Sequence, residues 1–247
     1  TQSFILISDY MYKNLLRRCK IMIIAAVFFF LLIGIAMLAF PGGNLIDTSS
    51  IHYNFFLNTL SDLGNSITIS GKTNTVSKIM YITAFGGLGI VMIYFSRIWW
   101  ALGTDVLEKK FAGYTSKICM IISGLAFIGI AFTPLSSFFD QHMLYLSIAF
   151  LAYTLWIIFI LILQFSNEKL RKLFLFNVIN LLIMLYYVFV IYHFEKPDAE
   201  DEFEFYAVSQ MVAVMSIIVN LFYQSVGIMH YLKTSDFRRS GFKNFYV

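Results

Sequence analysis

Asp62 and His142 are the side chains of this 247-residue chain that we rank first for chemistry. A carboxylate and an imidazole that lie close together can act as general base and general acid. With a third ligand such as His52, they could also bind zinc and a catalytic water. No His-Glu-x-x-His, His-x-x-x-His or Cys-x-x-Cys spacing occurs in the chain, so no short metal-binding motif supports zinc. Asp62 and His142 are therefore the candidate catalytic pair, and His52, Asp62 and His142 are the candidate metal ligands.

The elements that must position these residues are six long apolar runs. Each is near the ~20 residues that cross a hydrocarbon core about 30 Å thick. Lys, Arg, Asp and Glu lie between the runs or at their ends, and 59% of all residues are hydrophobic whereas 13% are charged. Such a composition does not belong to an ordinary soluble domain. The runs cover residues 21–40, 76–96, 116–135, 142–165, 173–194 and 206–232.

The basic residues orient the chain across the membrane. Of the 18 Lys and Arg residues, only Lys72, Lys78 and Lys196 lie on the side opposite the two termini. Because cytoplasmic segments carry the excess of Lys and Arg, both termini are predicted to be cytoplasmic. We predict an all-α polytopic membrane protein with six transmembrane helices. Its predicted parts are a cytoplasmic basic N-terminus (1–20), a transmembrane domain (21–232) and a cytoplasmic basic and aromatic tail (233–247).

The depth of the membrane carries no candidate ion site. Pumps, voltage sensors and most coupled transporters have paired ionisable groups inside their spans, and the middle of each run here lacks Asp, Glu, Lys and Arg. No pair of short, Gly- or Pro-broken spans indicates an inverted-repeat transporter. The basic residues are spread over segments beside the bilayer, where they suit lipid head groups and not nucleic acid. We therefore predict a non-transporting protein that binds no nucleic acid.

Polar residues inside the last two spans predict a helix-packing seam. Asn177 and Asn180 share a face of the fifth span, and three polar residues follow at steps of four in the sixth, namely Ser216, Asn220 and Gln224. Since the two helices run antiparallel, we expect Asn180 to bond to Gln224 near the cytoplasmic leaflet. Such a bond contributes about 1 kcal/mol, and we favour it over a polar permeation path. Small residues also indicate close helix contacts in the second and third spans: Gly86, Gly87, Gly89, Gly124 and Gly129.

The first outer loop is predicted to contain an amphipathic helix over residues 50–64. Its polar stripe would carry Asn58, Ser61 and Asp62. His142 begins the fourth span on the same side, and an isolated charge at that boundary is costly, so we expect Asp62 and His142 to pair. The expected outer polar pocket consists of Asn58, Ser61, Asp62, His52, His142 and His193. It could be a structural network, a lipid site, a catalytic site or a metal site.

The run Asn58-Thr59-Leu60-Ser61-Asp62-Leu63-Gly64, followed by Asn74 and Ser77, resembles the Asn-x-x-Ser-Asp-Leu-Gly signature of an uncharacterised six-helix family, number 998 among the domains of unknown function. That family is distantly similar to the Frag, DRAM and Sfk membrane proteins. A second similar block is Gly129-Ile130-Ala131-Phe132-Thr133-Pro134, then His142 and Phe150, in which Thr133 interrupts the family's Phe-Pro pair. The resemblance implies an association with lipids or membrane homeostasis.

These observations predict a protein that binds or senses membrane lipid through its outer polar pocket. A bound phospholipid is the expected ligand, ahead of zinc. One alternative is a lipid hydrolase or transferase with an outer-leaflet Asp62 and His142 site. The other is a structural accessory subunit, whose partners would be other membrane subunits.

The predicted topology can be tested by cysteine labelling in intact cells. A cysteine at Asp201 should react with an impermeant maleimide, and a cysteine at Lys110 should react only after the membrane is opened, because the loop that contains Lys110 is predicted to be cytoplasmic. The reverse pattern would show that the orientation is wrong.

Overall fold

Six long helices form a bundle in this computed structural model, which describes residues 2–102, 107–168, 170–193 and 200–233. All six are long and apolar enough to cross a membrane, so the prediction of an all-α six-span protein is confirmed. The predicted tail lies outside the described residues beyond Lys233. In chain order the elements are α1 (Gln2–Ala39), the 3₁₀ helix η1 (Leu60–Gly64), α2 (Thr75–Phe95), α3 (Arg97–Leu102), α4 (Leu107–Phe132), α5 (Phe139–Phe165), the 3₁₀ helix η2 (Arg171–Leu173), α6 (Phe174–His193) and α7 (Glu200–Lys233).

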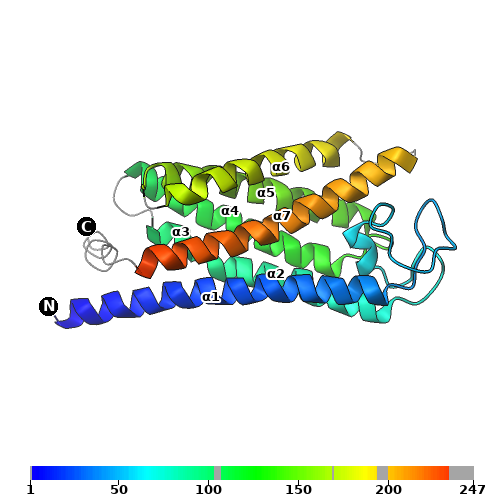
Figure 1. Cartoon of the computed structure of the whole chain (residues 1–247), viewed down its shortest axis with the longest axis horizontal. Helices are drawn as coiled ribbons and strands as arrows, with labels where there is room; N and C mark the ends of the chain where they lie inside the picture. The colour runs from blue at the N-terminus through cyan, green and yellow to red at the C-terminus, as the bar shows by residue number, and fades with distance from the viewer. Residues whose placement is uncertain (1, 103–106, 169, 194–199, 234–247) are drawn as a thin grey trace.

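The six long helices follow one another around a closed ring. α1 packs against α2 and α7, α4 lies between α2 and α5, and α6 lies between α5 and α7. Residues 40–74, which we call the 40–74 loop, cover one end of the bundle (Figure 1). We call this the loop end, and α1 begins at the opposite end (Figure 1).

Helix α1 begins well before the first apolar run, so most of the predicted N-terminal segment is helical. Its basic residues contact the end of α2: Arg17 Nε donates to Tyr94 Oη over 3.0 Å, and the Arg18 guanidinium lies 4.0 Å from the centre of the Tyr94 ring. Arg18 also donates to the carbonyl oxygen of Tyr94. These contacts fix the end of the bundle opposite the loop.

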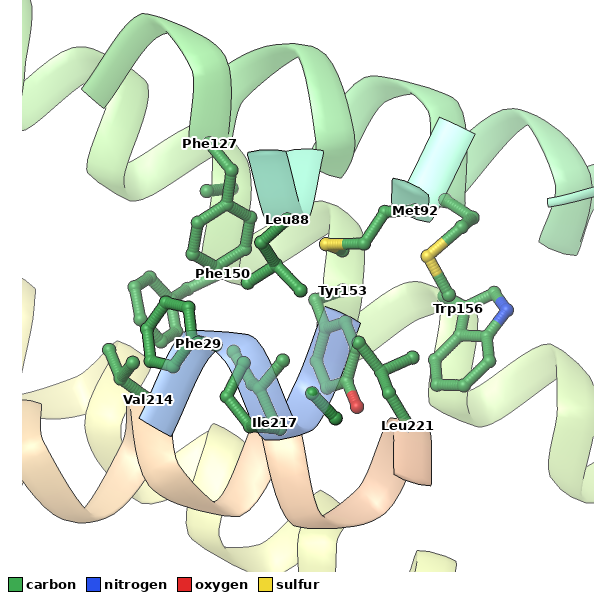
Figure 2. Packing of buried hydrophobic residues seen from close by; sticks show 14 of the residues in the cluster. Phe29, Leu88, Met92, Phe127, Phe150, Tyr153, Trp156, Val214, Ile217 and Leu221 are labelled. Carbon is green, nitrogen blue, oxygen red and sulfur yellow. The ribbon is translucent and has the colours of Figure 1, made fainter. Parts of the chain in front are cut away.

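Aromatic rings fill the middle of the bundle. Side chains from α1, α2, α4, α5 and α7 meet there (Figure 2). Ring contacts run from Phe29 to Phe85 at 5.2 Å, then to Phe127 and Phe150 at 6.0 Å each, and to Tyr187 at 4.6 Å. Edge-to-face and tilted ring pairs of this kind are favourable packing contacts. The chain of rings links α1 to α6 and leaves the centre packed with side chains.

Helices α2 and α4 cross at two glycines. A Cβ atom at Gly124 would lie 2.7 Å from the carbonyl oxygen of Gly89, and one at Gly89 would collide with the carbonyl oxygen of Gly124. The predicted close contact is therefore confirmed here. Gly129 packs on the ring of Tyr145. The prediction is wrong for Gly87, because no heavy atom lies within 4 Å of a Cβ built there.

The two glycines of α2 provide a matched test. Gly89→Ala should destabilise the protein by about 1–3 kcal/mol through overpacking. Gly87→Ala, whose added methyl group meets no neighbour, should be neutral or stabilise by up to about 1 kcal/mol through helix propensity. Both substitutions add the same methyl group to the same helix, so the difference reports the crossing. Thermal unfolding in detergent measures it, and equal midpoints for the two variants would contradict the close crossing.

Candidate functional site

The 40–74 loop folds differently from the predicted amphipathic helix. Only η1, the last five residues of segment 50–64, is helical, and residues before it form turns. The reason is visible at Asn58: its Oδ1 accepts from the Asn54 backbone at 3.0 Å, and its Nδ2 donates to the carbonyl of Gly43 at 3.0 Å. Asn side chains that bond to nearby backbone compete with helix formation. The predicted polar stripe is thus buried as the internal support of a loop.

Asp62 caps the helix in which it lies. Its Oδ2 accepts from the backbone N–H of Thr59 at 2.8 Å and from Asn58 Nδ2 at 3.4 Å, while Thr59 Oγ1 accepts from the backbone N–H of Asp62 at 3.2 Å. The Asp62 residue is only 7% exposed. Burial raises the pKa of its carboxyl from the ordinary 3.8 to about 6, although the hydrogen bonds from Thr59 and Asn58 favour the ionised form.

His142 bonds to Ser61 instead of Asp62. Its Nε2 lies 2.9 Å from Ser61 Oγ, and its Nδ1 lies 2.6 Å from the carbonyl oxygen of Thr133. Because a carbonyl oxygen only accepts, Nδ1 carries the proton, Nε2 accepts, and Ser61 donates. Asp62 and His142 therefore share no direct hydrogen bond: the carboxylate caps η1, and the neighbouring hydroxyl reaches the imidazole.

Gln210 of α7 holds η1 from the other side. Its Oε1 accepts from the backbone N–H of Leu60 at 2.9 Å, and its Nε2 donates to Ser61 Oγ at 3.4 Å. The sequence interpretation missed this residue. A glutamine near one end of an apolar span is itself a signal, because an amide in the membrane needs a partner.

Helix α2 fixes the C-terminal end of η1. Asn74 Nδ2 donates to the carbonyls of Leu63 and Asn65 at 3.0 Å each, and Ser77 Oγ donates to the Leu63 carbonyl at 3.2 Å. A Cβ atom at Gly64 would lie 2.6 Å from the Tyr81 ring, so only glycine lets η1 approach α2 this closely. Three helices, α2, α5 and α7, therefore anchor η1.

Beside η1 lies a mostly apolar groove at the loop end, with a volume of about 380 Å³. We call it the Asp62 groove. Among the described residues that line it, Asp62 is the one with a formal charge. The lining residues are Leu45, Thr59, Asp62, Asn65, Ile69, Leu135, Ser136, Phe139, Met143, Phe203 and Tyr206.

Two predicted pocket residues lie elsewhere. His52 is exposed on the 40–74 loop, and His193 is exposed at the end of α6, where its ring stacks on Phe189 at 5.1 Å between centres. Neither lines the Asp62 groove. In the described part of the chain, no three His, Cys, Asp or Glu side chains come together to hold a metal ion. His52, Asp62 and His142 consequently do not form the candidate zinc site.

The packing seam between α6 and α7 includes a residue of α5 that the sequence interpretation missed. Gln164 Oε1 accepts from Asn177 Nδ2 at 2.7 Å, and Gln164 Nε2 donates to Gln224 Oε1 at 2.9 Å. Asn220 Nδ2 completes the cluster by donating to Asn177 Oδ1 at 2.8 Å. All four side chains are buried. The cluster cross-links three helices near the end opposite the loop.

The expected bond between Asn180 and Gln224 is wrong. Asn180 Nδ2 donates instead to the backbone carbonyl of Ser216 at 3.1 Å. Gln164, where α5 ends, donates to Gln224 Oε1, and Asn180 bonds to the backbone of α7 that faces it. The predicted seam residues of α6 and α7 are therefore in contact, but Asn180 and Gln224 bond to other partners than each other.

Comparison with known proteins adds no relative to this picture: no family model, curated protein or solved structure matches the chain.

Proposed function

We propose that this membrane protein binds a single lipid-like amphiphile in the Asp62 groove. The observation that carries the proposal is an apolar groove of about 380 Å³ with one carboxylate at its wall. Ligand sites of about 300–1,000 Å³ are typically apolar with a few placed polar groups. The groove lies at the end of the bundle, where a head group could stay near water while a chain contacts Phe139 and Met143. A phospholipid or related amphiphile is the ligand class that fits.

The packed centre of the bundle supports a binding role without transport. Rings from α1 to α6 occupy the middle, and Trp156 and Tyr153 lie fully buried among them (Figure 2). A permeation path would need continuous polar or water-filled space. We further propose that the loop end faces the outside of the cell. The basic residues Arg17, Arg18 and Lys117 at the opposite end support this orientation.

We also propose membership of the six-helix family whose signature the 40–74 loop resembles. The residues of that signature have a common physical task in this chain. Asn58 and Asp62 bond to backbone groups of the loop, and Ser61 bonds to His142. Asn74 and Ser77 hold η1 at the start of α2. A shared fold of the loop would account for a shared signature.

The lipid proposal is tested by blocking the groove. Met143→Trp places a large side chain into the groove, whereas Leu144→Trp is the matched control, because Leu144 is 58% exposed on the next position of α5. We expect Met143→Trp to lower the binding of a photoreactive phospholipid by about tenfold, equivalent to about 1.4 kcal/mol. Quantitative crosslinking in detergent, with the labelled peptides identified by mass spectrometry, measures the change. Equal labelling of both variants, or labelling away from the groove, would contradict the proposal.

A second candidate function is lipid hydrolysis with Ser61 as nucleophile and His142 as base. The 2.9 Å contact and the Nδ1–carbonyl bond that orients the ring favour it, since nucleophile, base and orienting group are the parts that such a site needs. Ser61 is 4% exposed and does not line the Asp62 groove. A substrate would therefore reach the hydroxyl only after η1 moves, which places hydrolysis second.

A serine-reactive fluorophosphonate distinguishes the two roles of Ser61. If Ser61 is a nucleophile, the probe should label the parent protein in lipid vesicles, and Ser61→Ala should abolish both labelling and lipid turnover. If Ser61 only anchors η1, neither is observed in the parent, and Ser61→Ala lowers stability by about 1–2 kcal/mol through the lost hydrogen bond. Labelling that persists in Ser61→Ala would exclude Ser61 as the nucleophile.

A further inference from the structure

We propose that the Asp62 groove selects amphiphiles with a cationic amine head group, such as a primary or quaternary ammonium, and that Asp62 is the counter-ion. This inference rests on the proposed function and adds the chemistry of the head group. It follows from the charge of the groove, the free acceptor of Asp62 and the aromatic lining.

The groove offers a negative charge without a positive one. Its described lining contains Asp62 and no Lys or Arg. The two lysines at this end among the described residues are bound elsewhere: Lys72 Nζ donates to the Pro41 carbonyl at 3.3 Å, and Lys78 Nζ donates to Ser66 Oγ at 2.7 Å. An anionic head group would therefore face the carboxylate of Asp62 with no cation to compensate. A cationic head group would offset the cost of burying that carboxylate.

One oxygen of Asp62 remains available to a ligand. Oδ2 accepts both hydrogen bonds, from Thr59 and Asn58, whereas no described residue donates to Oδ1. The residue is more than nine-tenths buried and lines the groove. Oδ1 is not among the fully buried unpaired atoms of the described residues, so it is accessible from the groove that Asp62 lines. An ammonium group in the groove would supply the missing partner.

Aromatic side chains surround the same space. Phe139, Phe203 and Tyr206 line the groove together with Asp62. Recognition of quaternary ammonium ligands commonly uses aromatic side chains, whose ring faces attract cations. Asp201 and Glu204 on the first turns of α7 lie beside a neighbouring groove and add negative charge to this end. Their field would raise the local concentration of cationic head groups.

Binding should depend on the ionisation of Asp62. The phenols that interact with Asp62 are those of Tyr53 of the loop, Tyr81 of α2 and Tyr206 of α7. An ordinary phenol is uncharged near pH 7. His142 of α5 bonds to the adjacent Ser61. Because the pKa of Asp62 is about 6, the carboxylate is ionised at pH 7.5 and mostly protonated at pH 5. Affinity for a cationic head group should therefore fall as pH decreases through about 6, and affinity for an uncharged head group should not.

The experiment compares four amphiphiles with the same chain: dodecyltrimethylammonium, dodecylamine, dodecanol and dodecyl sulfate. Binding to the full-length protein in maltoside micelles is measured by calorimetry at pH 7.5 and 5, with protein-free micelles as the baseline. At the higher pH we expect both ammonium compounds to bind about tenfold tighter than dodecanol, and dodecyl sulfate to bind weaker still. Asp62→Asn should remove the advantage of the ammonium compounds and leave dodecanol unchanged. Asp140→Asn is the control, because Asp140 is an exposed carboxylate at the start of α5 outside the groove.

The outcomes separate the two proposals. Equal affinity for the ammonium compounds, dodecanol and dodecyl sulfate would overturn the head-group inference and leave lipid binding intact. No binding above the micelle baseline by any of the four would overturn the proposed function as well. Tetramethylammonium has no chain, and equal affinity for it would show that the groove takes a soluble amine and not an amphiphile. The pH dependence of the parent protein provides the same test if Asp62→Asn does not fold.

Discussion

The hydrogen bonds that hold η1 on the bundle are the constraint on which the loop end depends. A loop placed against apolar helix ends must satisfy its backbone groups internally, because buried unpaired N–H and C=O groups are costly. Gln210 of α7 and Ser77 of α2 bond to that backbone, and His142 of α5 bonds to the side chain of Ser61. The Asp62 groove exists because η1 is held at this position. Thr59 and Asp62, which form the capping box of η1, line the groove. Residues of α5 and α7 line it as well.

The two ends of the bundle are stabilised by different chemistry. At the loop end, side chains bond to the backbone of a loop, so the contacts shape a surface that a ligand can reach. At the opposite end, the amides of Gln164, Asn177, Asn220 and Gln224 bond to one another between three helices. Such interhelical bonds are modest individually, at about 0.6–2 kcal/mol. They fix the relative rotation of α5, α6 and α7, and through α5 and α7 they also position the anchors of η1.

Most of the fold follows from the sequence, whereas the site follows only in part. The number and order of spans are set by apolar runs and need no knowledge of partners. Asn58, Ser61, Asp62 and His142 lie together as expected, because a polar segment of the 40–74 loop and the start of α5 share one end of the bundle. Their pairing was not predictable. In a helix over 50–64, Asp62 would lie on the polar stripe expected to meet His142. The side-chain bonds of Asn58 to local backbone stop that helix, and the capping box turns Asp62 back on Thr59. Gln164 and Gln210 were missed because their partners lie far away in sequence.

Asp62 has two roles, as a helix cap and as a buried carboxylate, and only the second involves a charge. As a capping residue it needs an oxygen that accepts, and an asparagine could supply that oxygen without a buried charge. As a carboxylate it retains a charge that burial disfavours strongly enough to raise the pKa of Asp62 to about 6. Capping uses Oδ2, and Oδ1 stays accessible from the groove without a donor among the described residues. A cation in the adjacent groove would contact Oδ1 and offset the charge of the carboxylate. It would thus do what a Lys or Arg side chain in the lining would otherwise do. Because a cap alone would not need a charged side chain, we propose a cationic ligand for the groove.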